Sequence, residues 1–223
     1  MQRMRAALQR RSYRPRVCYL VQTAQELQYG YYRLISRTKS YHAMTTFTLI
    51  TGNAHKLAEF KRLLPADCLF DHLALDLDEI QSFDPGVIIA DKARRAYEIV
   101  KKPVVVEDVS AGLDKLNGLP GPFIKFFEMQ LGADALYKLA GTETAATVTS
   151  TIAYYDGQAM LLSQGVITGS VVPMAVDNGF GFDGVFVPSG QSQTFSQMTP
   201  VEKDAISHRA QAIQNLLKQL KEL

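Results

Sequence analysis

The stretch FTLITGNAHK, residues 47–56, decides how the rest of the sequence is interpreted. Its first four residues are β-branched or large and apolar, which predicts a short buried strand. Residues 51–53 have turn chemistry, and from His55 the apolar residues fall at helical spacing until Pro65. A strand that turns directly into a helix leaves backbone N–H groups pointing beyond the strand end, and this arrangement suits phosphate.

Lys56 supports the phosphate interpretation. A cation in the first turn of a helix is disfavoured by the helix dipole by roughly 0.3–1 kcal/mol, so its position is better explained if an anion binds there. The alternative is that Thr51 or Asn53 only caps a surface helix. A P-loop is excluded because G-x-x-x-x-G-K-[ST] is absent, and the two interpretations stay open from this stretch alone.

Length and composition favour one sizeable core. The chain has 223 residues, 47% of them hydrophobic, and no apolar run approaches the roughly 20 residues that span a bilayer. Cys18 and Cys68 have no metal-type spacing and favour a reducing compartment. We therefore expect a cytoplasmic protein without a membrane partner.

Residues 1–43 differ from the rest of the chain. They hold nine lysines and arginines against one acid, a net charge of +8, so the remainder carries −6 of the total of +2. This composition is typical of an organelle transit segment, which would make the location organellar, but it also fits a basic arm or sequence upstream of a true start at Met44. In each case residues 44–223 form the domain, and its negative charge argues against nucleic acid as a partner.

Strands and helices are predicted to alternate through the first half of the domain. Residues 68–77 predict a second strand, and a helix capped by Asp84 spans about 85–100. The apolar run 104–106 is typical of a central strand covered on both faces. We expect Glu107 and Asp108 to lie at the end of that strand.

The second half predicts a β-hairpin and a broken C-terminal helix. Strands at 147–155 and 159–166 flank an Asp-Gly turn. Lys203 and Arg209 are six residues apart, about 240° around a continuous helix, so they can face one ligand only if the helix breaks between them. Thr199 and Glu202 form a capping box, and Ser207 can cap a second helix. We predict a short turn at 199–206 and a separate helix from about 207.

Five segments carry a family resemblance when taken in order: TGNAHK, VEDVSAGL, GLPGPFIKFF, NGFGFD and EKDAISHR. Together, over about residues 46–220, they resemble the motif series of the inosine triphosphate pyrophosphatase (ITPase) family. The resemblance implies an α/β fold with an elongated mixed β-sheet flanked by helices, and two lobes with a central cleft. It also implies a homodimer that uses Mg²⁺ to hydrolyse inosine and xanthosine (deoxy)nucleoside triphosphates, small-molecule substrates, to the monophosphate and pyrophosphate.

The resemblance also implies roles for individual residues. The triphosphate would be bound by Thr51, Gly52, Asn53, Ala54, His55, Lys56, Lys92, Val109 and Lys125. The metal would be held by Glu79 and Asp108, with Asp108 also the proton acceptor. The base pocket would be formed by Phe180, Gly181, Phe182, Asp183, Lys203, His208 and Arg209. Glu107 alternates to the other side of its strand and is ranked below Asp108.

Three positions depart from the family pattern. Phe182 stands where the family usually has Trp or Tyr, Gly184 stands where it has Pro, and Val109 stands where it has Ser or Thr. These changes concern base selection more than phosphate chemistry. They would favour a first alternative, a pyrophosphatase for other modified nucleotides. A separate alternative is a nucleotide-sensing module that binds without turnover.

Overall fold

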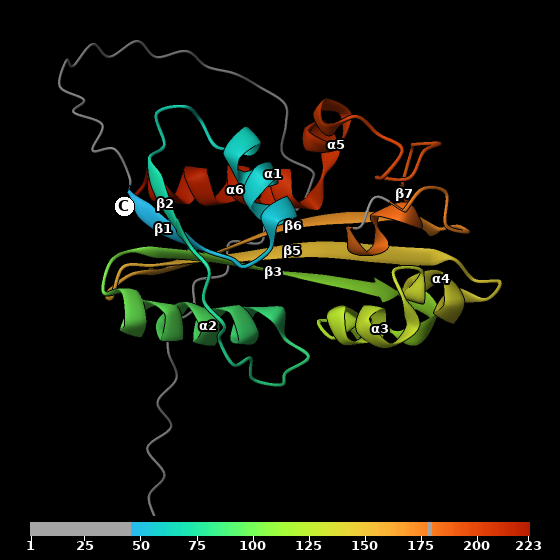
Figure 1. The fold of residues 1–223 in the computed structure, drawn as a ribbon, viewed down its shortest axis with the longest axis horizontal. Coiled ribbons are helices and arrows are strands. Elements are labelled where there is room, and N and C mark those ends of the chain that lie inside the picture. The colour runs from blue at the N-terminus through green and yellow to red at the C-terminus, as the bar shows by residue number, and fades with distance from the viewer. Residues whose placement is uncertain (1–45, 178–179) are drawn as a thin grey trace, which may run out of the picture. The chain divides into compact units, whose positions relative to one another are not determined.

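The computed structural model describes residues 46–177 and 180–223, so the interpretations of residues 1–43 lie outside the described part (Figure 1). These residues form a seven-stranded mixed sheet in the order β2-β1-β3-β5-β6-β7, with β4 paired to β3. Parallel pairs join β1 (Phe47–Ile50) to β2 (Phe70–Leu73) and to β3 (Val104–Leu113). The antiparallel strands are β4 (Pro120–Gly121), β5 (Ala145–Tyr155), β6 (Met160–Val171) and β7 (Phe186–Pro188).

Helices cover both faces of this sheet, which confirms the predicted α/β fold with a mixed sheet flanked by helices. On one face, Phe60 of α1 (Ala54–Leu63) and Ile213 of α6 (His208–Leu220) pack with Val105. On the opposite face, Ile89 of α2 (Pro85–Val100) packs with Val106. The third cluster joins α3 (Ile124–Leu131) and α4 (Ala135–Ala140) to the distal halves of β3 and β5.

The prediction that the central strand ends at residues 107–108 is wrong, because β3 continues to Leu113. All ten of its residues pair with β5, which overrides the two acids in its middle. In contrast, β1 pairs with β3 at residues 104–106 and not further along that strand. Glu107 and Asp108 therefore lie beside the C-terminal end of β1 and the turn that follows it. The second strand is also shorter than predicted, at Phe70–Leu73.

The predicted break in the C-terminal helix is confirmed. The first piece is a short helix, α5 (Pro200–Ile206), which begins with a capping box between Thr199 and Glu202. Ser207 is extended, with ψ 151°, and its Oγ accepts a hydrogen bond of 3.1 Å from Ala210 N. A new helix axis therefore starts at residue 208, and this frees Lys203 and Arg209 from the angle that a continuous helix would impose.

Candidate active site

The turn after β1 is closed by its own side chains. Asn53 Oδ1 accepts hydrogen bonds from His55 N at 2.9 Å and from Lys56 N at 3.2 Å. Thr51 Oγ1 accepts one from Asn53 N at 3.1 Å. Asn53 is therefore the N-cap of α1, and two of the N–H groups that could have bound phosphate are already satisfied.

Lys56 extends from this turn toward β3. Its Nζ lies 2.9 Å from Glu107 Oε2 and 3.3 Å from the Glu107 carbonyl oxygen. The side chain is partly exposed, whereas that of Glu107 is buried. Lys56 is thus a cation at the edge of the site that already faces one carboxylate.

Glu79, Lys92 and Asp108 come together on the α2 side of β3. Glu79 forms an ion pair with Lys92 of α2. Burial raises the pKa of Asp108, Glu79 and Glu107 add to that effect, and Lys56 and Lys92 oppose it. Burial alone would raise the pKa of Glu79, but Lys92, Lys125 and Lys56 hold it below its ordinary value. Lys56 and Lys92 thus act on both carboxyl groups, and Lys125 acts on Glu79.

These two carboxyl groups suit a metal ion whose remaining ligands come from a bound substrate. Within residues 46–177 and 180–223, no group of three or more His, Cys, Asp or Glu residues is placed to hold a metal ion. Mg²⁺ often takes only one or two carboxylates and completes its shell with substrate phosphate and water. Glu79 and Asp108 are a donor set of that kind, and a bound cation would favour the ionised form of Asp108, whose pKa is raised by burial.

Behind the turn lies a buried charge cluster with three acids and three bases. Lys203 Nζ lies 2.8 Å from Glu59 Oε1 and also contacts Asp183. Arg209 contacts Glu59, and its Nε lies 2.8 Å from Glu107 Oε1. Lys56 completes the cluster through Glu107. Lys203 and Arg209 therefore do converge, but on carboxylates of the protein.

The charged groups of this cluster neutralise one another away from bulk water. Arg209 is only 1% exposed, so its guanidinium has no contact with bulk water. Although burial opposes ionisation, Arg209 and then Lys56 hold the pKa of Glu107 well below its ordinary range, and Ser150 Oγ donates to Glu107 Oε1 at 2.7 Å. Arg209 and Lys203 also hold the pKa of Glu59 below its ordinary value despite burial. The charges are matched, which is what allows them to be buried.

Phe180 covers the cations of this cluster. Its ring centroid lies 4.7 Å from Lys203 Nζ and 5.5 Å from Arg209 Cζ. The Phe180 ring is also stacked on that of His55, with centroids 4.9 Å apart and planes 14° apart. An aromatic ring thus already occupies a position between the phosphate turn and the two cations.

His208 is a neutral residue in an aromatic setting. Its ring centroid lies 6.2 Å from that of Phe182 and 5.9 Å from that of Phe195. Burial, and then Arg209, lower the pKa of His208 well below its ordinary value. Its Nδ1 is buried and has no hydrogen-bond partner among the described residues. A buried ring nitrogen of this kind can serve as a hydrogen-bonding group for a ligand.

Other predicted residues are placed differently. The side chain of Val109 packs against the hydrophobic cluster around α3 and α4. Lys125 is exposed on α3, and Gly52 and Ala54 are exposed at the turn. The glycine at position 184 has a steric explanation, because the Cβ of any other residue there would lie 2.6 Å from the Val176 carbonyl oxygen. A proline would meet the same obstacle.

Two acids of the charge cluster were not among the predicted site residues: Glu59 was not singled out, and Glu107 was ranked below Asp108. The helical spacing Lys56, Glu59, Phe60 places Glu59 on the face that packs on the sheet, and this was a usable signal. Glu107 does alternate to the side opposite Asp108, where it is buried under α1 and α6. Its partner Ser150 comes from β5, and no local pattern indicates that pairing.

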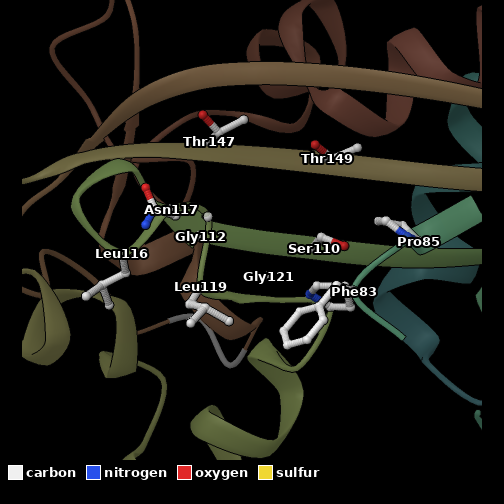
Figure 2. A pocket seen from close by; sticks show the side chains of 12 residues that line it. Phe83, Pro85, Ser110, Gly112, Leu116, Asn117, Leu119, Gly121, Thr147 and Thr149 are labelled. Atoms are coloured by element: carbon white, nitrogen blue, oxygen red, sulfur yellow. The ribbon is translucent and has the colours of Figure 1, made fainter. Parts of the chain in front are cut away.

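A cavity of about 510 Å³ lies beside this site (Figure 2). Ser110, Thr147 and Thr149 line it from the sheet, and Phe83 and Leu119 line it from loops. None of the predicted site residues contributes to its wall. Ser110 is two residues beyond Asp108 on the same face of β3, so the cavity adjoins the pair of carboxyl groups.

Known proteins match this chain over the same region. The model of the Ham1 family matches residues 47–219. The inosine triphosphate pyrophosphatase of Schizosaccharomyces pombe is 37% identical over 78% of this chain and 94% of its own length. That of Yarrowia lipolytica is 44% identical over 75% and 91%.

Solved structures agree with this assignment. The HAM1 protein of Coxiella burnetii superposes with a TM-score of 0.67 at 30% identity, covering 81% of this chain and all of that one (100%). A nucleoside-triphosphatase described as a dITP/XTP pyrophosphatase from Mycobacterium abscessus gives 0.59 at 28% identity over 78% and 99%. The motif order, the mixed sheet and these matches have one explanation: the chain belongs to the Ham1 family, and the predicted resemblance to inosine triphosphate pyrophosphatases is confirmed.

Proposed function

We propose that this chain hydrolyses inosine and xanthosine (deoxy)nucleoside triphosphates to the monophosphate and pyrophosphate, with Mg²⁺. The observation that carries the proposal is that Lys56 and Lys92 act on both Glu79 and Asp108, and Lys125 on Glu79. Beside them, Phe180 lies against the buried cation of Lys203. Matched relatives named inosine triphosphate pyrophosphatases support it.

The triphosphate would be bound at the lysine-rich edge. Lysine is a compact cation that suits phosphate, and three lysines compensate much of the charge of a triphosphate. Lys56 would exchange its contact with Glu107 for a phosphate contact, and Lys92 would leave Glu79. The turn would contribute Thr51, Gly52, Asn53, Ala54 and His55.

Glu79 and Asp108 would hold the metal, which when bound supplies charge neutralisation at the phosphate oxygens and orients the attacking water. Asp108 would accept the proton of that water. Burial raises the pKa of Asp108, which makes it a stronger base than an exposed aspartate. Bond formation at the α-phosphorus would release pyrophosphate as the leaving group.

The base would enter where Phe180 now lies between His55 and the cations. Phe180 would stack on the purine, with Gly181, Phe182 and Asp183 shaping the loop. Lys203, His208 and Arg209 would form the opposite wall. A buried donor directed at a 6-oxo group accepts hypoxanthine or xanthine, whereas the 6-amino group of adenine leaves it unpaired. Such a mismatch can reject the wrong substrate by factors on the order of 10⁴.

The test is turnover of ITP, XTP, dITP, GTP and ATP with Mg²⁺ by the full chain, scored separately for pyrophosphate and for free phosphate. We expect pyrophosphate from ITP, XTP and dITP, with ATP far slower. GTP also has a 6-oxo group, so its rate tests whether the site rejects a 2-amino group. Release of single phosphates, or no turnover by a folded protein, contradicts the proposal. Faster turnover of other modified nucleotides supports the alternative of a related pyrophosphatase with a different base preference. Phe182 favours that alternative, because a phenylalanine ring stacks on a base but lacks the polar group of Tyr or Trp.

Assembly and location are further proposals. We propose a homodimer, supported by large apolar side chains that α3 leaves exposed, Phe126 and Met129 among them. Light scattering after size-exclusion chromatography tests it, and a 24.8 kDa species refutes it.

We also propose a cytoplasmic location, with organellar import as the alternative, to be tested by imaging the full chain against one starting at Met44. Among the described residues, no helix is long and apolar enough to cross a membrane.

A further inference from the structure

Glu128 on α3 is a partly buried acid that the proposed chemistry does not use. Its Oε1 is buried and has no hydrogen-bond partner among the described residues. The backbone N–H of Phe182 lies near this carboxyl group and acts to lower its pKa. Phe182 lies in η2 (Gly181–Gly184), the short 3₁₀ turn of the proposed base loop. Glu128 is therefore a neighbour of the base loop that comes from a different element.

The carboxyl group occupies the space where a side chain at position 181 would lie. A Cβ added to Gly181 would lie 2.9 Å from Glu128 Oε1 and 3.2 Å from Oε2. Gly181 also has a φ of +49°, which most residues with a side chain avoid. The absence of a side chain at position 181 thus lets the Glu128 carboxyl group approach the backbone of the turn, which Phe180 precedes and Asp183 follows in the sequence.

The charge on Glu128 changes this contact. Burial raises the pKa of Glu128 to about 7, the Phe182 N–H opposes the rise, and the charge of Asp183 adds to it. The charged groups on the packed elements are Lys125 on α3, Asp183 on η2, Glu107 and Asp108 on β3, and the Asp134–Lys138 pair at 2.8 Å at α4. Of these, Asp183 is the one that acts on Glu128. Ionised Glu128 repels it and requires water, so the contact is best satisfied when Glu128 is protonated.

We propose that Glu128 is a positioning residue for the base loop: protonated, it holds residues 180–183 in the conformation that accepts a purine, and ionised, it loosens them. The inference rests on the proposed function, because it assigns the loop to the base. It makes nucleotide affinity fall as pH rises through neutrality, without a direct contact between Glu128 and the substrate.

The test compares wild type with Glu128→Gln, which has the shape and the donor of the protonated acid. KM and kcat for ITP are measured from about pH 5.5 to about pH 9. As pH rises through neutrality, we expect the ratio of the wild-type KM to the KM of Glu128→Gln to increase at least about fivefold, with a smaller change in kcat. A factor of about five is the lower end of typical coupling between two sites in a protein. Ionisation of ITP affects both proteins equally, and Glu98→Gln on the exposed surface of α2 is the matched control. Parallel KM curves for wild type and Glu128→Gln overturn the proposal.

A second measurement needs no substrate. A raised pKa in the folded state contributes stability below the unfolded value, and this contribution is lost as pH rises through the folded value. The melting temperature of Glu128→Gln should therefore increase relative to wild type between about pH 5.5 and about pH 8.5, and a constant difference overturns the proposal. A wild type that does not turn over ITP refutes the proposed function instead, so the two failures are distinguishable.

Discussion

Arg209→Leu provides the most direct test of the buried charge cluster. Arg209 contacts the carboxylates of both Glu59 and Glu107 and is 1% exposed. Its removal leaves three acids facing two bases in a region with little access to water. Removing one partner of a buried pair typically costs about 3–5 kcal/mol, because the other charge stays buried. Lys203 and Lys56 still pair with the two carboxylates, so we expect about 4 kcal/mol, within that range.

The assay is equilibrium unfolding in urea. A loss of about 4 kcal/mol lowers the folding equilibrium constant by roughly a thousandfold, a large part of a typical stability of about 5–15 kcal/mol. Arg62→Leu is the matched control, since Arg62 Nε lies 2.7 Å from Asp204 Oδ2 in a more exposed ion pair. Such pairs contribute about 0–1 kcal/mol. Equal losses for Arg209→Leu and Arg62→Leu refute the reasoning.

The same variant has a predictable pH dependence. Arg209 and its neighbours hold the pKa values of Glu59 and Glu107 down in the folded state, so their contribution to stability is present above the unfolded pKa and lost as pH falls through the folded one. Without Arg209 these acids take up protons at higher pH. The loss caused by Arg209→Leu should therefore be smaller near pH 4.5 than near pH 7.5, and Glu107→Gln added to it should restore part of the stability at pH 7.5.

Three other predictions concern packing and catalysis. Gly165→Ala adds a Cβ 2.6 Å from Ala212 N and should lower the free energy of unfolding in urea by at least about 2 kcal/mol. The control is Gly52→Ala, whose Cβ has no heavy atom within 4 Å and which should change that free energy by less than about 1 kcal/mol. Equal effects of the two substitutions would show that α6 moves to accommodate the new Cβ. Asp108→Asn should lower kcat for ITP by about 10²–10⁴ while ITP still binds in calorimetry, and an unchanged kcat would contradict the proton-acceptor role. Chelation with EDTA should abolish pyrophosphate release, and Mg²⁺ should restore it; continued turnover would exclude the metal role.

Local rules predicted much of this fold from the sequence. The capping box at Thr199 and the cap at Ser207 are encoded within a few residues, so the broken C-terminal helix was accessible. The Asp-Gly turn between β5 and β6 is local as well, with Asp156 Oδ1 accepting hydrogen bonds from Gln158 N and Ala159 N at 2.8 Å. These features depend on chemistry that neighbouring residues provide.

The features that were missed depend on distant partners. Residues 107–110 lie in a strand only because β5 pairs with them across the sheet, and their acidic start had suggested a strand end. The buried cluster joins Glu59 to residues 144 and 150 positions later. A pattern within one window shows that Glu59 lies on a buried face, but not which cation neutralises it.

The sequence separation within that cluster has a consequence for biosynthesis. A polypeptide is made from its N-terminus, and Glu59 and Glu107 are synthesised long before Arg209, their shared partner on α6. Until α6 emerges, the nascent chain cannot bury those acids without cost, so the sheet is held short of its final packing. We therefore expect the core to close only when the chain is complete, and a chain truncated before residue 209 to stay incompletely packed.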